Sequence, residues 1–167
     1  MKLRFYPLDK SAAREIVRWR YAPPYDIYNI EDSNESINYA LKSENNFYAI
    51  RDENTGLVGF CSFGKDGQVP GGNYVEPALD IGMGIRPDLT GQGVGNDLVA
   101  AVLNFAQKTF SSEQFRVTIA TFNQRARRVW EKNGFRSTQK FVDINNNREF
   151  VVMICLHRNA NNHEFIE

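Results

Sequence analysis

The sequence contains little of what several protein classes require. Its 167 residues include two cysteines and two histidines, and 20 Lys and Arg side chains balance 20 Asp and Glu side chains. Cys61 and Cys155 are isolated within apolar runs, which predicts buried free thiols rather than a disulfide framework. No His/Cys cluster has metal-ligand spacing, so no metal is expected. A net charge of zero gives no general attraction to nucleic acid or to an anionic membrane.

Long apolar runs are missing as well. No stretch approaches the roughly 20 residues that a membrane span needs, and the first six residues lack the apolar core of a signal peptide. We therefore expect a cytoplasmic protein with no membrane partner. The content of 42% hydrophobic and 13% aromatic residues favours a globular chain. The length fits a single domain over residues 1–167, in which the last ten or so polar residues form a loose tail.

Three glycines at alternate positions lie in the middle of the chain. Gly91, Gly93 and Gly95 follow an apolar run at 78–85 and precede an amphipathic run at 98–110, so they lie where a strand becomes a helix. Glycine allows a tight backbone turn and the close approach of a ligand. The first N–H groups of a helix have no internal partner and lie at its positive end. The loop is therefore a candidate site for a phosphate or pyrophosphate.

Other phosphate-binding loops fit this pattern poorly. A P-loop would need Gly-Lys-Ser or Gly-Lys-Thr, and no Lys, Ser or Thr follows Gly95. A Rossmann fingerprint would need a third glycine where Asn96 or Leu98 stands, and an acidic residue about 20 residues on, where only Glu113 is found. An ordinary glycine-rich turn without a ligand is the alternative.

A second segment, at 117–135, repeats the order of a β-rich run followed by a helix. Asn123 is a good helix N-cap, and Gly134 is a good C-terminal stop. Ala126 and Trp130 fall on one side of this helix. The pattern Asn-x-x-Ala-x-x-x-Trp-x-x-x-Gly-Phe thus follows the glycine loop Pro-Asp-Leu-Thr-Gly-Gln-Gly-Val-Gly in order.

Both blocks together resemble the GCN5-related N-acetyltransferase (GNAT) superfamily. In that family a strand, a Gln/Arg-x-x-Gly-x-Gly/Ala loop and a helix bind the pyrophosphate of acetyl-CoA. An Asn-x-x-Ala-x-x-x-Tyr-x-x-x-Gly-Phe segment comes later. This chain departs from the family at Thr90, where Gln or Arg is usual, and at Trp130, where Tyr is usual.

The expected elements follow the GNAT order. Periodicity and turn residues predict strands at 2–6, 47–51, 57–63, 78–85, 115–120, 135–142 and 149–156, and helices at 11–19, 33–41, 91–110 and 124–133. The resemblance implies an α/β (α+β) fold with a mixed central sheet of about seven strands and helices on both faces. It also implies that the two central strands splay apart and hold the pantetheine arm of acetyl-CoA.

The resemblance further implies which residues bind acetyl-CoA, the co-substrate. The pyrophosphate would bind backbone N–H groups of the glycine loop. The pantetheine arm would pair with the end of the strand at 78–85, whose backbone would polarise the thioester carbonyl. Asn123 is carried over as a contact, although as a helix N-cap it needs no ligand. The expected cofactor-binding residues are Met83, Gly84, Ile85, Gly91, Gln92, Gly93, Val94, Gly95, Asn96 and Asn123. One of Arg125, Arg127 and Arg128 could add a phosphate contact.

The usual acid–base residues of the family are missing. Acetylation of an amine needs a base for the ammonium and a proton for the leaving thiolate. The family's tyrosine is here Trp130, whose indole is not a usable acid, and the glutamate of another branch is here Thr118. Asp80, preceded by Glu76, is the candidate base if its side chain faces the cleft. Loop tyrosines could supply the acid, or none is needed because a thiolate is a good leaving group; the loop candidates are Tyr74, Tyr25 and Tyr28.

We therefore expect an acetyl-CoA-dependent N-acetyltransferase that acts on a primary amine of a small molecule or peptide. Aromatic and acidic residues at 21–35, a stretch without Lys or Arg, would favour a cationic amine. One alternative is a GNAT-fold module that binds acyl-CoA without turnover. Another is a nucleic-acid-binding domain that uses the helix at 124–133, which the zero net charge disfavours. A homodimer is left open, and neither nucleic acid nor a membrane is expected as a partner.

Overall fold

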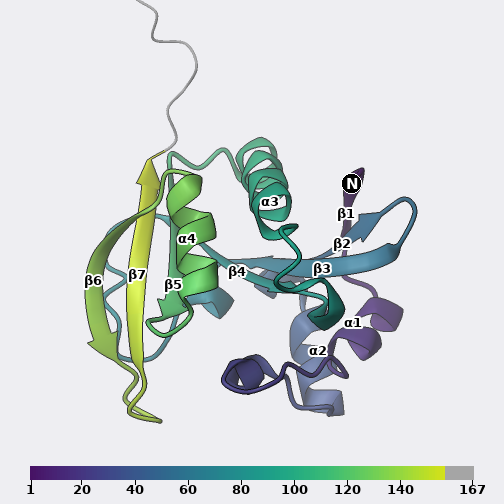
Figure 1. Ribbon diagram of the computed structural model, residues 1–167, viewed down its shortest axis with the longest axis horizontal. Helices are drawn as coiled ribbons and strands as arrows, with labels where there is room; N and C mark the ends of the chain where they lie inside the picture. Colours follow the sequence, from purple (N-terminus) through teal and green to yellow (C-terminus); the bar gives the residue numbers. More distant parts are fainter. Residues whose placement is uncertain (157–167) are drawn as a thin grey trace, which may run out of the picture.

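The computed structural model describes residues 1–156, and the expected loose tail lies outside these described residues. Seven strands form one mixed sheet with the order β1-β2-β3-β4-β5-β7-β6 (Figure 1). The strands are β1 (Leu3–Pro7), β2 (Phe47–Asp52), β3 (Gly56–Phe63), β4 (Leu79–Ile85), β5 (Gln114–Ala120), β6 (Arg136–Val142) and β7 (Glu149–Leu156). The expected mixed sheet of about seven strands is confirmed.

Four α-helices and four short 3₁₀ turns connect these strands. The helices are α1 (Lys10–Ile16), α2 (Asn34–Leu41), α3 (Gly95–Phe110) and α4 (Gln124–Lys132), and the turns are η1 (Tyr25–Tyr28), η2 (Ser43–Asn45), η3 (Lys65–Gly67) and η4 (Pro87–Leu89). Among residues 1–156, the helices are too short or too polar to cross a membrane.

The helices cover both faces of the sheet. Neighbouring side chains on a strand point to opposite faces, so apolar neighbours on one strand pack against helices on different sides. On β2, Ala49 packs with Ala12 and Ile16 of α1. Its neighbour Ile50 belongs to the larger cluster, which includes Leu98 of α3. Figure 1 accordingly shows α1 and α2 on one side of the sheet and α3 and α4 on the other.

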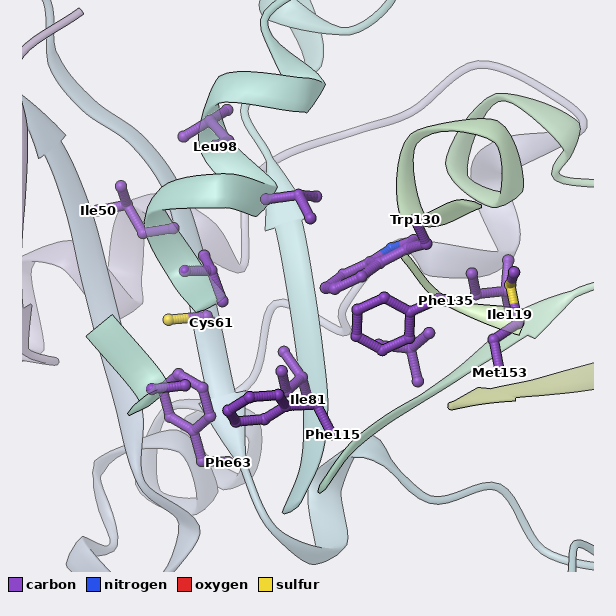
Figure 2. Packing of buried hydrophobic residues seen from close by; sticks show 14 of the residues in the cluster. Ile50, Cys61, Phe63, Ile81, Leu98, Phe115, Ile119, Trp130, Phe135 and Met153 are labelled. Atoms are coloured by element: carbon purple, nitrogen blue, oxygen red, sulfur yellow. The ribbon is translucent and has the colours of Figure 1, made fainter. Parts of the chain in front are cut away.

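Trp130 of α4 lies in the larger core cluster. Its side chain is 6% exposed, and its ring lies 4.8 Å from the ring of Phe135 at an interplanar angle of 73°. Figure 2 shows this pair above the strands, near Ile119 and Met153. Full burial of a side chain of this size contributes about 2–3 kcal/mol or more to stability, so the residue that replaces the family's tyrosine is part of the core.

Two helix starts differ from the sequence prediction. Helix α3 begins at Gly95 rather than at residue 91, because Gly91 and Gly93 have φ angles of +76° and +82°, which a right-handed helix does not allow. Helix α1 begins after Asp9, whose carboxylate accepts a hydrogen bond from Ala12 N at 2.7 Å. Asp9 is therefore the N-cap of α1, which starts one residue earlier than predicted.

The two central strands separate soon after they pair. Strands β4 and β5 run parallel, and their register covers only Leu79 with Phe115 and Asp80 with Arg116. On its other side β4 stays paired with β3 as far as Ile85. The remainder of β4 therefore has an edge without a strand neighbour within residues 1–156, as the resemblance implied.

Candidate active site

A cavity of about 1400 Å³ opens where β4 and β5 separate. Of the ten cofactor-binding residues predicted from the sequence, eight line it: Met83, Gly84, Ile85, Gly91, Gly93, Gly95, Asn96 and Asn123. The other two do not. Val94 packs against the hydrophobic core, and the side chain of Gln92 donates to Asp88 O at 2.6 Å.

The glycine loop leads into α3, whose first turn has no capping side chain. Val94 occupies the N-cap position and makes no side-chain hydrogen bond to the first turn. The first hydrogen bond of the helix runs from Leu98 N to Val94 O, at 3.1 Å. The N–H groups of Gly95, Asn96 and Asp97 therefore have no acceptor within the helix. Together with the helix dipole, these donors make this part of the cavity wall a candidate anion site.

The free edge of β4 presents backbone groups to the cavity. Arg86 N donates to Val58 O at 2.9 Å, which makes these two a hydrogen-bonded pair. Along an antiparallel strand, the backbone groups of alternate residues point toward the partner strand and away from it. Because Arg86 points toward β3, Met83 and Ile85 turn their N–H and C=O groups away from β3. The Tyr21 hydroxyl donates to Ile85 O at 2.7 Å, which shows that this edge accepts a donor from outside the sheet.

Asn123 caps α4 and also lines the cavity. Its Oδ1 accepts from Ala126 N at 3.1 Å, so it caps α4. Its Nδ2 donates to the Tyr28 hydroxyl at 3.2 Å, and the residue lines the cavity. A cap and a cavity contact are therefore compatible, because they use different atoms of the amide.

Of the three arginines on α4, Arg125 is the one that lines the cavity. Its Nε donates to the Tyr25 hydroxyl at 2.9 Å, and its guanidinium lies 4.1 Å from the centre of the Tyr25 ring. Its Nη1 lies 3.1 Å from the position that a Cβ atom on Gly91 would occupy. The guanidinium thus lies beside the glycine loop at the cavity wall.

Asp80 does not meet the condition that its side chain faces the cleft. The residue is 3% exposed and is not part of the cavity wall. Its Oδ1 and Oδ2 accept from Arg116 Nε at 2.6 Å and Nη2 at 2.8 Å, and Gln68 Nε2 donates to Oδ2 at 2.9 Å. The hydrogen bond to this carboxylate raises the pKa of Arg116. We therefore assign Asp80 to a buried ion pair that joins β4 to β5, and not to the role of base.

The candidate acids lie in different surroundings. Tyr74 is held against β5: its hydroxyl accepts from Val69 N at 2.9 Å and lies 2.9 Å from Thr118 Oγ1. Tyr28 lines the cavity, and burial raises its pKa. Tyr21, which the sequence did not single out as an acid, also lines the cavity, and burial raises its pKa to about 12. Tyr21 and Tyr28 are thus protonated hydrogen-bond donors at neutral pH.

Two glycines on β4 leave room for side chains of its neighbours. A Cβ atom on Gly84 would overlap the ring of Phe60 on β3. A Cβ atom on Gly82 would overlap Ser62 Oγ and lie 3.1 Å from Asp66 Oδ2. Both glycines are therefore required by packing, and Gly82 brings a carboxylate close to the β4 backbone.

The part of the cavity wall contributed by α2, η3, β2 and β3 is acidic and aromatic. Glu35 and Tyr39 of α2 line it, together with Asp66 of η3, Phe47 and Phe60. Glu35 belongs to the acidic segment predicted to wall the acceptor site. Asp66 was missed, because only the pairing of β3 with β4 brings it to the cavity. No group of three or more His, Cys, Asp and Glu side chains in the described part of the chain is placed to hold a metal ion.

Comparisons with known proteins agree with this geometry. A chimera of the Vibrio cholerae spermidine N-acetyltransferase SpeG and hSSAT superposes with a TM-score of 0.72 and 18% identity, over 93% of this chain and 96% of that one. A GNAT-family acetyltransferase from Bacillus anthracis gives a TM-score of 0.72 and 17% identity, over 93% and 95%. At such identities the similarity shows the fold. No curated protein sequence matches significantly.

The family is shown by the sequence itself. The model of the acetyltransferase (GNAT) domain matches residues 5–136, which include the glycine loop and the sheet from within β1 to β5, and end at the first residue of β6. The chain therefore belongs to the GNAT acetyltransferase family and is an N-acetyltransferase.

Proposed function

We propose that this enzyme transfers the acetyl group of acetyl-CoA to a primary amine that carries a positive charge before reaction. One observation carries the proposal. A single cavity runs from the uncapped N-terminus of α3, along the free edge of β4, to a wall with two carboxylates. The first two features suit a diphosphate and an extended amide arm, and the third suits an ammonium group.

The described residues fit acetyl-CoA at three points. The backbone N–H groups of Gly95 and Asn96 would bind the pyrophosphate, and Arg125 would add a charged donor beside the loop. The backbone of Met83 and Ile85 would pair with the pantetheine arm, as a neighbouring strand would. These are the proposed binding residues.

The same residues can perform acyl transfer. A backbone N–H on the free edge of β4 can donate to the thioester carbonyl oxygen as negative charge develops there. The hydroxyl group of Tyr28, which accepts a hydrogen bond from Asn123 Nδ2, can donate its own proton in a hydrogen bond to the sulfur as it leaves. A thiolate with a pKa near the ordinary value of about 8.5 for a thiol is a good leaving group, so no stronger acid is required.

The proposal predicts release of thiol from acetyl-CoA in the presence of a cationic amine. A panel of spermidine, kanamycin, lysine and a short peptide with a free N-terminus would be tested by a thiol-reactive dye; spermidine is included because the SpeG structure above is named for it. Turnover should be fastest with the most highly charged amines, because the acceptor wall is acidic.

Two other outcomes would point to the alternatives. Binding of acetyl-CoA without turnover of any amine would favour a module that only holds the acyl-CoA. Retention on DNA that falls with rising salt would favour a nucleic-acid-binding domain.

Arg125→Ala should weaken the binding of coenzyme A about tenfold to 100-fold, because a charge-assisted hydrogen bond contributes roughly 1.5–3 kcal/mol. The matched control is Arg128→Ala, which removes an exposed arginine from the same helix outside the cavity. Isothermal titration calorimetry with coenzyme A measures both. Equal affinities for the two variants would show that Arg125 makes no phosphate contact.

A further inference from the structure

Asp66 lies beside the part of β4 that faces the cavity. Its Oδ2 is 3.1 Å from the position of a Cβ atom on Gly82, the residue before Met83, whose backbone points toward the cavity. The side chain is half-buried and lines the cavity. A carboxylate at this place can reach a group that approaches the β4 backbone.

Two hydroxyl groups hold the Asp66 carboxylate. Ser62 is fully buried, and its Oγ donates to Asp66 Oδ2 at 2.6 Å. The Tyr39 hydroxyl also lies at this carboxylate: burial first, and then the charge of Asp66 and a hydrogen bond to it, raise the pKa of Tyr39 to about 12. These neutral donors orient the carboxylate without cancelling its charge.

Asp66 differs from Asp80 because no cationic side chain in the described part of the chain forms an ion pair with it. Within residues 1–156, the ion pairs involve Asp32, Glu53, Asp80 and Asp88 but not Asp66. A half-buried carboxylate without a counter-ion attracts a cation strongly, because water screens it poorly. The ammonium group of an acceptor amine would supply that charge.

We propose that Asp66 binds the ammonium group of the acceptor amine and takes its proton, a role that rests on the proposed acetyl transfer. The proton moves from nitrogen to the Asp66 carboxylate, and the free amine attacks the carbonyl carbon of the thioester. A C–N bond forms, the C–S bond breaks, and the second proton on nitrogen goes to the thiolate, which leaves as a thiol. Asp66 then releases its proton to water, and no redox partner is required.

Asp66→Asn tests this role, because it keeps the size of the side chain but cannot accept the proton. We expect kcat/KM for the best amine of the panel above to fall about 100-fold, at the lower end of general acid–base effects. The affinity for coenzyme A, measured by calorimetry, should not change. Glu113→Gln is the matched control, since it removes an exposed carboxylate outside the cavity, and its kcat/KM should equal that of the wild type.

A second amine separates proton transfer from binding. Trifluoroethylamine is largely unprotonated at neutral pH, so it does not need the base. Its acetylation should fall less than threefold in Asp66→Asn. An equal loss for the charged amine and for trifluoroethylamine would overturn the role of Asp66 as base. Should Asp66→Asn not fold, Asp66→Ser gives the same comparison with a smaller neutral side chain.

The two proposals fail in different ways. If the wild type acetylates an amine and Asp66→Asn does so within threefold, the inference about Asp66 is wrong and the proposed function stands. If the wild type acetylates no amine in the panel although it binds acetyl-CoA, the proposed function fails and Asp66 loses its role with it.

Discussion

Replacing Gly93 by valine should weaken the binding of coenzyme A about 1,000-fold. Gly93 has a φ of +82°, a region in which a β-branched residue is strained. Relief of that strain would rotate the peptide groups before α3 and turn their N–H groups away from the pyrophosphate. Loss of two charge-assisted hydrogen bonds, at roughly 2 kcal/mol each, corresponds to about 1,000-fold in affinity.

In the protein without a ligand, a side chain at position 93 has room. A Cβ atom on Gly93 meets nothing within 4 Å, so valine would occupy the volume proposed for the cofactor without displacing protein atoms. Calorimetry with coenzyme A measures the loss of affinity, and circular dichroism checks that the variant is folded. Unchanged affinity would contradict the assignment of this loop to the pyrophosphate.

Gly56→Val is the matched control for backbone strain. Gly56, at the start of β3, has a φ of +77° and also has nothing within 4 Å of an added Cβ atom. It does not line the cavity. Both valine variants should lose about 1–2 kcal/mol of stability from the left-handed conformation, but only Gly93→Val should lose affinity for coenzyme A.

Asp80→Asn should lower the free energy of unfolding by about 3 kcal/mol. The Arg116 guanidinium is 3% exposed and would lose the charge that compensates it. Removal of one partner from a buried ion pair typically costs about 3–5 kcal/mol, and asparagine keeps part of the hydrogen bonding. Urea unfolding followed by circular dichroism measures the change.

The same variant tests whether Asp80 acts in catalysis. If it only joins β4 to β5, the folded Asp80→Asn enzyme keeps its turnover within about threefold and its pH–rate profile. Loss of a limb of that profile, with unchanged stability, would restore Asp80 as the base. Asp88→Asn is the control: the Asp88 carboxylate bonds Arg86 at 2.7 Å and 3.1 Å in a similar geometry, but its side chain is 64% exposed. Its stability should change little, because water screens an exposed pair.

The order of the elements could be predicted because it follows from local patterns, and the fold class because the two motifs resemble those of the GNAT family. Apolar periodicity, the N-cap Asn123 and the position of the glycine loop depend on residues close in sequence. The predicted start of α3, at residue 91, was four residues too early, because the sequence does not show that Gly91 and Gly93 adopt positive φ angles.

The roles of the two carboxylates depended on contacts between distant residues. Asp80 looked like a candidate base, but its partner Arg116 lies 36 residues away on β5. Asp66 carried no signal in the sequence, and the antiparallel register that pairs Ser62 with Gly82 brings it to the cavity. Only the register of the strands shows which carboxylate is neutralised in the sheet and which faces the cavity.

The sequence by itself determined the family and the place of the glycine loop between a strand and a helix, because motif spacing and helix polarity are encoded in short stretches of chain; the resemblance to the family then implied the mixed sheet. The tertiary structure alone decided which charged side chains face one another. A strand inside a sheet has covered faces on both sides, so the surroundings of its side chains are set by residues that lie far apart in the sequence.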